Sequence, residues 1–286
     1  MAYPGKWRET CDPFALAYHA FRPTEVLGYP HAGNDVFHMR GQYEGRDMTA
    51  FVKVARQKDA NLENEVRILL QLKAPMFPRV LDYDREGFQF SVTEEMLGER
   101  LSVIVGENRN GEALSYMEEY GEMLAQLHAL PVKANRQADR RFHHRPTREA
   151  LEALGLAYLD EFFANPPRNG ETVFCHGDFH YANVLWRAHH ISAVLDFELA
   201  GYGSRDFDLA WALFLRPGQK FLRTGEEAEC FLDGYRKAGG YCDAEAVRYF
   251  MAQCYVHFLG FIKDVDYCAY ARDWLKQLNT GINIEK

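Results

Sequence analysis

The sequence has no apolar run as long as a membrane-spanning helix, so an integral membrane protein is not expected. It is also poor in bases relative to acids. Its 286 residues include 33 Lys and Arg against 41 Asp and Glu, a formal net charge of −8 at pH 7. A net-acidic chain is a poor candidate for binding nucleic acid or an anionic membrane, and neither partner is expected.

Paired cysteines and a signal peptide are missing as well. The six cysteines form no CxxC pair and show no zinc-binding spacing. In a chain of this size they are typical of reduced thiols, with a disulfide framework as the less favoured alternative. Near the N-terminus, Lys6, Arg8, Glu9 and Asp12 leave no room for the apolar core of a signal peptide. These features predict a cytoplasmic protein.

The composition is that of a globular protein, with 47% apolar and 26% charged residues. Such a length accommodates one large domain or two modest ones. The pattern changes near Gly98, from short β-rich segments to helical ones. The sequence therefore predicts an α+β protein with two lobes: a small β-rich lobe over residues 1–97 and a larger, mostly helical lobe over residues 98–286.

Within the first lobe, apolar runs separated by turn residues predict strands over 24–29, 36–40, 48–55, 79–83 and 88–93. Helical spacing of leucines predicts one helix over 61–73. In the strand over 48–55, Phe51 and Lys53 lie two apart and so project from the same face. Beyond Gly98, a capping-box pattern at Ser115 and Glu118 predicts a helix start, another helix is expected over 147–165, and the tail from Gly225 is expected to be helical.

Polar residues that suit catalysis interrupt the second lobe. Residues 172–186 read TVFCHGDFHYANVLW, two short strands around a polar loop, and a buried strand ending in Asp196 follows. Oxygen-bearing side chains at strand ends are costly to bury without partners. Magnesium and a phosphate chain would satisfy Asn183 and Asp196, leaving Asp178 to accept a hydroxyl proton. Each residue alone is common in loops, but the set together with Lys53 favours a site.

These residues, taken in order along the chain, resemble those of a known family. The order Lys53, Glu65, HGDxxxxN at 176–183 and Asp196 resembles the aminoglycoside phosphotransferase and choline kinase family, which has a protein-kinase-like fold. The stretch LAQLHALP at 124–131 and the DLA at 208–210 also match. The resemblance runs from about residue 24 to about residue 215.

The resemblance implies a kinase that transfers the γ-phosphate of ATP, with GTP not excluded, to a hydroxyl group in the presence of Mg²⁺. It also implies a role for each matching residue. Lys53 would hold the α- and β-phosphates and Glu65 would hold Lys53. Asp178 would be the catalytic base, and Asn183 and Asp196 would bind magnesium.

Further positions on the nucleotide side follow from the same resemblance. Gly33 lies in the turn that would cover the phosphates, and it is the single glycine of that turn. Backbone groups between Thr93 and Glu95 would face the purine. Phe51 would stack on the base, or would equally well belong to the strand core.

The acceptor is expected to be a small molecule. Only twelve positions separate Asp196 from Asp208, which leaves little room for a peptide-docking platform and disfavours a protein kinase. A catalytically inactive nucleotide-binding regulator is a second alternative. It is disfavoured because the key positions carry competent residue types.

Acids not used by magnesium suggest a cationic acceptor. Glu198 and Asp206 are the leading candidates, with Asp264 and Asp266 in the tail as further ones. The best expectation is an aminoglycoside-like antibiotic, and hence a role in antibiotic resistance. The alternative is a metabolic kinase of choline, an amino alcohol or a sugar. The protein would act as a monomer or dimer.

Overall fold

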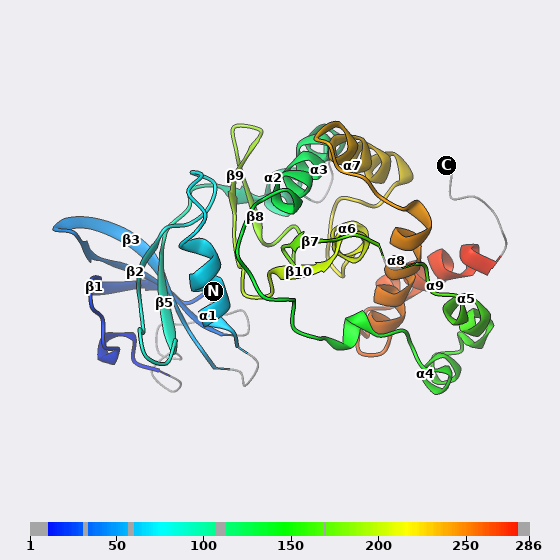
Figure 1. The fold of residues 1–286 in the computed structure, drawn as a ribbon, viewed down its shortest axis with the longest axis horizontal. Helices are drawn as coiled ribbons and strands as arrows, with labels where there is room; N and C mark the ends of the chain where they lie inside the picture. Colours follow the sequence, from blue (N-terminus) through cyan, green and yellow to red (C-terminus); the bar gives the residue numbers. More distant parts are fainter. Residues whose placement is uncertain (1–10, 31–33, 57–59, 107–111, 169, 280–286) are drawn as a thin grey trace. The chain divides into compact units, whose positions relative to one another are not determined.

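The computed structural model describes residues 11–30, 34–56, 60–106, 112–168 and 170–279. The chain divides into two compact units (Figure 1). The N-terminal unit comprises Met1–Gly98, Val132–Ala134 and Ser192–Ala200, and the C-terminal unit comprises Glu99–Pro131, Asn135–Ile191 and Gly201–Lys286. In the described residues no helix is long and apolar enough to cross a membrane. The two short returns to the N-terminal unit were not expected from the sequence.

The N-terminal unit is built on a five-stranded sheet in the order β1-β2-β3-β5-β4, with antiparallel neighbours. Its strands are β1 (Arg22–Gly28), β2 (Asp35–Tyr43), β3 (Arg46–Val54), β4 (Val80–Tyr83) and β5 (Phe90–Glu94). Alternate residues of the central strands are fully buried, among them Phe37, Met39, Ala50, Val52 and Val92. The 3₁₀ turn η2 (Pro13–Ala15) precedes the sheet.

The helix α1 (Leu62–Leu69) lies beside this sheet and contacts β4 and β5 (Figure 1). It begins at its N-cap Asn61, whose side chain accepts a hydrogen bond from the Asn64 amide at 3.2 Å. The sequence predicts that this helix extends to Lys73, but it ends four residues earlier, at Leu69. Its buried face includes Glu65, which places a carboxylate on the side of the helix that packs inward.

The C-terminal unit carries short strands among its helices. Strand β6 (Glu99–Arg100) pairs with β8 (Val184–Arg187), and β7 (Thr172–Cys175) pairs with β10 (Gly201–Ser204), both antiparallel. Strand β9 (His190–Val194) follows β8, and its last three residues belong to the N-terminal unit. The polar loop of residues 176–183 therefore connects β7 to β8, as the sequence predicts.

Helices make up most of the C-terminal unit (Figure 1). They are α2 (Leu101–Val105), α3 (Leu114–His128), η3 (Arg141–His143), α4 (Arg148–Ala153), η4 (Ala157–Leu159), α5 (Asp160–Ala164), α6 (Arg205–Leu213), α7 (Gly225–Lys237), α8 (Ala244–Leu259) and α9 (Val265–Asn279). Their main core is aromatic and lies around α6 and α8, with Phe207, Trp211, Phe214 and Tyr255 at its centre.

Two predicted helix features are wrong. The helix expected over 147–165 is divided into α4, η4 and α5, because Gly155 takes a left-handed conformation with φ of 67° and ends the first segment. Ser115 does not cap α3. The helix begins at Leu114, its N-cap position is Ala113, and the Ser115 hydroxyl donates to the Glu112 carbonyl at 2.8 Å.

Helices α3 and α7 cross with their backbones nearly touching. A Cβ atom at Gly121 would lie 1.8 Å from the Phe231 carbonyl oxygen, and one at Gly234 would lie 1.9 Å from the Glu118 carbonyl oxygen. Only glycine fits at either position. This close packing fixes α3, which carries His128 to the polar loop described below.

Candidate active site

Lys53 is the centre of a charged cluster in the N-terminal unit. Its Nζ atom, on β3, lies 2.9 Å from Glu65 Oε2 on α1, 3.0 Å from Asp196 Oδ1 and 3.7 Å from Glu198 Oε2. Burial alone would lower the pKa of Lys53, but the Glu65, Asp196 and Glu198 carboxylates outweigh it and hold that pKa well above its usual value. The three carboxylates therefore favour the charged form of Lys53.

Asp196 is the most accessible carboxylate of this cluster. Its side chain is 41% exposed, against 5% for Glu65 and 14% for Glu198. Its backbone adopts φ of 65°, a left-handed conformation that is uncommon for a residue other than glycine. Such strain persists where surrounding contacts hold it, and it is frequent at functional sites. One oxygen of Asp196 meets Lys53, so the carboxylate keeps a second oxygen for a ligand.

The other predicted nucleotide-side residues are strand residues of the same unit. The Phe51 ring stacks on the His38 imidazole with centroids 4.8 Å apart, and His38 Nε2 lies 3.2 Å from Glu95 Oε1. Thr93 is the register partner of Phe51 on β5. Phe51, Thr93 and Glu95 thus come from neighbouring positions of β3 and the end of β5. Gly33 lies outside the described residues.

Asp178, in the loop between β7 and β8, is surrounded by donors. Its Oδ1 accepts a hydrogen bond from Trp211 Nε1 at 2.8 Å, while Oδ2 lies 3.2 Å from Asn183 Nδ2 and 3.4 Å from His180 Nε2. Burial would raise the pKa of Asp178. The hydrogen bond and charge of His180, the charge of Arg216 and the Trp211 bond outweigh burial and hold that pKa well below its usual value. The side chain is still 23% exposed and can be reached by a substrate.

Two arginines support this loop, and sequence reasoning missed both. The guanidinium groups of Arg140 and Arg216 lie 5.0 Å and 4.9 Å from the ring centroid of Trp211. Arg140 Nη2 donates to the Gly177 carbonyl at 2.7 Å, next to Asp178 in sequence, and Arg216 Nη2 donates to the Trp211 carbonyl at 2.7 Å. Neither arginine lies in a recognisable motif, so nothing in the sequence pointed to them.

Asp208 ties down the start of the same loop. Its carboxylate accepts the backbone N–H groups of His176 and Gly177, both at 2.9 Å, and lies 3.2 Å from His128 Nε2. Asp208 does not cap α6, however, because the N-cap position belongs to Ser204. His128 is a packed, hydrogen-bonded histidine with a structural role.

The acids expected to attract a cationic acceptor have different surroundings. Asp206 is 1% exposed and accepts the Asp243 amide at 3.2 Å, with Arg205 Nε 3.5 Å away. Asp264 accepts the Tyr267 amide at 2.8 Å at the start of α9. Asp266 is exposed in the first turn of α9. Asp206 and Asp264 therefore stabilise local structure.

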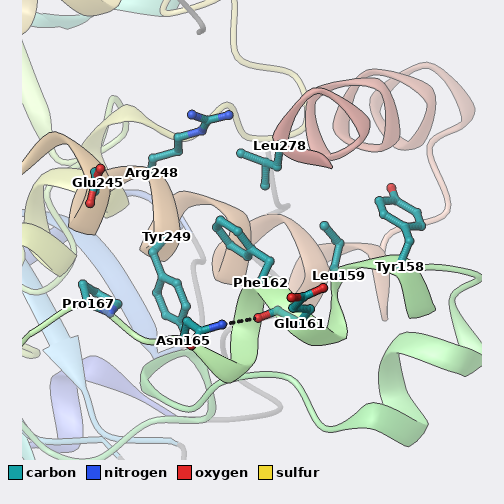
Figure 2. Close-up of a pocket in the computed structure, with 10 residues that line it drawn as sticks. All are labelled: Tyr158, Leu159, Glu161, Phe162, Asn165, Pro167, Glu245, Arg248, Tyr249 and Leu278. Carbon is teal, nitrogen blue, oxygen red and sulfur yellow. Dashed lines mark hydrogen bonds between the residues drawn. The ribbon is translucent and has the colours of Figure 1, made fainter. Parts of the chain in front are cut away.

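A pocket of about 440 Å³ lies in the C-terminal unit among α5, α8 and α9 (Figure 2). Its walls are part apolar and part polar, and its lining includes Phe162, Tyr249 and Leu278 together with Arg248 and Glu161. None of the residues expected in the site from the sequence lines it. This pocket is therefore separate from the two candidate groups of functional residues, the Lys53 cluster of the N-terminal unit and the Asp178 loop of the C-terminal unit.

The side chains of Asn183 and Asp196 both suit magnesium. The Asn183 amide nitrogen donates to the Asp178 carbonyl at 3.0 Å, so the atom that Asn183 would offer to a metal is its amide oxygen. Asp196 offers the carboxylate oxygen that does not meet Lys53. Magnesium prefers such oxygen ligands, usually one or two from the protein with phosphate oxygens and waters completing its shell.

Solved structures with the same fold are protein-kinase-like enzymes. An amicoumacin kinase in complex with AMP-PNP and Ca²⁺ is 16% identical with a TM-score of 0.62, over 99% of this chain and 97% of that chain. A macrolide 2′-phosphotransferase from Brachybacterium faecium is 20% identical with a TM-score of 0.54, over 90% of this chain and 92% of that chain. A choline/ethanolamine kinase family protein from Mesorhizobium loti is 19% identical with a TM-score of 0.57, over 96% of this chain and 92% of that chain. The expected protein-kinase-like α+β fold is confirmed.

The sequence model of the phosphotransferase enzyme family (APH) matches residues 30–241, well over half of the chain. The chain belongs to this family, and the resemblance seen in its motifs is confirmed. The protein is accordingly a small-molecule phosphotransferase. No curated protein matches the sequence.

Proposed function

We propose that this phosphotransferase transfers the γ-phosphate of ATP, with GTP as a second possible donor, to a hydroxyl group of a small molecule in the cytoplasm. The observation that carries the proposal is the Lys53 cluster: a buried cation held 2.9 Å from Glu65 and 3.0 Å from the accessible Asp196. A fixed cation beside a metal-binding carboxylate is the arrangement that phosphoryl transfer requires.

On the donor side, Lys53 would bind the α- and β-phosphates, and Glu65 would hold its ammonium group in place. Gly33 would help to cover the phosphates. Thr93 and Glu95 would present backbone groups to the purine, and Phe51 would line the base. Asp196 and Asn183 would hold Mg²⁺, which supplies charge neutralisation on the phosphate oxygens when bound.

On the acceptor side, Asp178 would orient the attacking hydroxyl. Its strongly stabilised negative charge makes it a weak base, so it accepts the hydroxyl proton only as the oxygen–phosphorus bond forms. This timing suits a loose transition state, in which positioning of the hydroxyl contributes more than early proton removal. Trp211 and Asn183, which contact the Asp178 carboxylate, would fix its orientation.

For the acceptor we propose an aminoglycoside-like amino sugar first, and choline, another amino alcohol or a neutral sugar second. Antibiotic kinases among the structural relatives support the first class, and the choline/ethanolamine kinase family protein supports the second. Because Asp206 and Asp264 have structural partners, attraction of a cation by these two acids adds no support.

A coupled assay with magnesium and ATP or GTP, run against a panel of aminoglycosides, amino alcohols and sugars, tests the proposal. We expect saturable turnover with at least one hydroxyl-bearing acceptor, and slow nucleotide hydrolysis without one. Binding of magnesium–nucleotide with neither transfer nor hydrolysis would identify the protein as a nucleotide-binding regulator instead.

A further inference from the structure

Glu198 was expected at the acceptor site, but its side chain is fully engaged within the N-terminal unit. Oε1 accepts a hydrogen bond from the Asn61 backbone amide at 2.7 Å, and Oε2 accepts one from Asn34 Nδ2 at 2.9 Å. Lys53 Nζ lies 3.7 Å from Oε2. Glu198 thus contacts three parts of the N-terminal unit: Asn61 at the N-cap of α1, Asn34 just before β2, and Lys53 on β3.

Asn64 makes the reciprocal connection from α1. Its Nδ2 group lies within hydrogen-bond distance of three backbone carbonyl oxygens, those of Phe197 at 3.3 Å, Glu198 at 3.0 Å and Ala200 at 2.8 Å. These carbonyls belong to residues that follow Asp196 within four positions of the chain. One amide side chain therefore fastens the helix that carries Glu65 to the segment that carries Asp196.

The hydrogen bonds of Glu198 and of Asn64 both link the helix that carries Glu65 to the segment that carries Asp196. Glu65 and Asp196 come from α1 and from the segment after β9, and both must meet Lys53. Asp196 also holds a left-handed backbone conformation, which neighbouring contacts must enforce. The Asn64 and Glu198 bonds begin one residue after Asp196, so they are placed to enforce it.

We propose that Glu198 and Asn64 are positioning residues of the donor side, which hold α1 and the Asp196 segment in the geometry that binds magnesium–nucleotide. This rests on the proposed function. It moves Glu198 from the acceptor site, where the sequence placed it, to the donor side. Loss of either connection weakens nucleotide binding and leaves recognition of the acceptor unchanged.

Calorimetric titration with Mg–AMP-PNP tests this without any acceptor. We expect Glu198→Gln and Asn64→Ala each to raise the Kd by about tenfold, the size expected for losing hydrogen bonds that involve a charged or multiply bonded group. Glu198→Ala, which removes both acceptor oxygens, should have a larger effect than Glu198→Gln. Glu63→Gln is the matched control, since Glu63 is on α1 but pairs with Arg67 at the surface.

Steady-state kinetics with the best acceptor of the panel supply the second measurement. The KM for nucleotide should rise in both variants, while the KM for the acceptor stays at the wild-type value. A raised acceptor KM with an unchanged Mg–AMP-PNP Kd in Glu198→Gln overturns the inference and returns Glu198 to the acceptor site. Wild-type Kd values in Glu198→Gln and Asn64→Ala also overturn it. Failure of the wild-type protein to bind Mg–AMP-PNP contradicts the proposed function itself.

Discussion

Trp211 donates a hydrogen bond of 2.8 Å from its indole nitrogen to Oδ1 of Asp178. The tryptophan comes from α6 and the aspartate from the β7–β8 loop, so the bond links an aromatic helix core to the proposed catalytic residue. The second oxygen, Oδ2, lies 3.2 Å from Asn183 Nδ2 and 3.4 Å from His180 Nε2. In the proposed mechanism the indole would therefore help to fix the orientation of the carboxylate toward the acceptor hydroxyl.

Trp211→Phe should lower kcat by about tenfold to a hundredfold, because a hydrogen bond to a charged group contributes about 1.5–3 kcal/mol. The affinity for Mg–nucleotide should not change, since the contacts described for Trp211 are with residues of the C-terminal unit and not with the Lys53 cluster. Single-turnover kinetics and nucleotide titration measure the two quantities separately. Trp274→Phe, which alters a tryptophan packed against Tyr255, controls for general effects of aromatic substitution. Equal kcat values in both variants would remove the orienting role.

Asp178→Asn should abolish phosphoryl transfer, with a loss of about 10² to 10⁴ in rate, while nucleotide affinity stays nearly unchanged. The amide keeps the shape of the side chain but cannot accept the hydroxyl proton. Rate measurement at saturating acceptor, paired with calorimetry, checks both halves of this expectation. Turnover near the wild-type level would show that the site has been assigned to the wrong loop.

Sequence reasoning singled out the parts of the candidate site that depend on local order. Lys53 could be placed because alternation along a strand fixes its face, and the loop with Asp178 could be placed because two apolar strands frame it. Trp211, Arg140 and Arg216 could not, since they meet through packing of segments far apart in the chain. The engagement of Asp206 was also hidden, because its burial depends on the Asp243 amide from another segment.

Asp196→Ala should remove the magnesium dependence of nucleotide binding. The variant loses the accessible carboxylate beside Lys53, while Lys53 keeps its pair with Glu65 at 2.9 Å. Titration of AMP-PNP with and without magnesium should therefore give the same weak Kd, in contrast to the wild-type protein. Unchanged tight binding in the presence of magnesium would contradict the metal role of Asp196.

Buried cysteines should resist alkylation. Burial raises the pKa of Cys254 to about 12 and that of Cys175 well above its usual value, which leaves about 10⁻⁴ of Cys254 as thiolate at pH 8. Iodoacetamide should modify both only after unfolding, and peptide mapping by mass spectrometry measures this. Cys268, which is partly exposed, serves as the internal comparison. Rapid labelling of Cys254 in the native protein would contradict its burial.

Gly121→Ala should destabilise the protein although alanine favours helices by about 1 kcal/mol over glycine. The new Cβ would lie 1.8 Å from the Phe231 carbonyl, a rigid backbone atom that cannot rotate away, so α3 and α7 must separate. Overpacking of this kind costs about 1–3 kcal/mol or more, which exceeds the gain in helix propensity. Thermal and urea unfolding should show a lower midpoint.

Gly28→Ala is the matched control, because its Cβ would meet only the His38 Cβ at 3.9 Å. If Gly121→Ala unfolds at or above the wild-type midpoint, the two helices do not pack as closely as the structure shows.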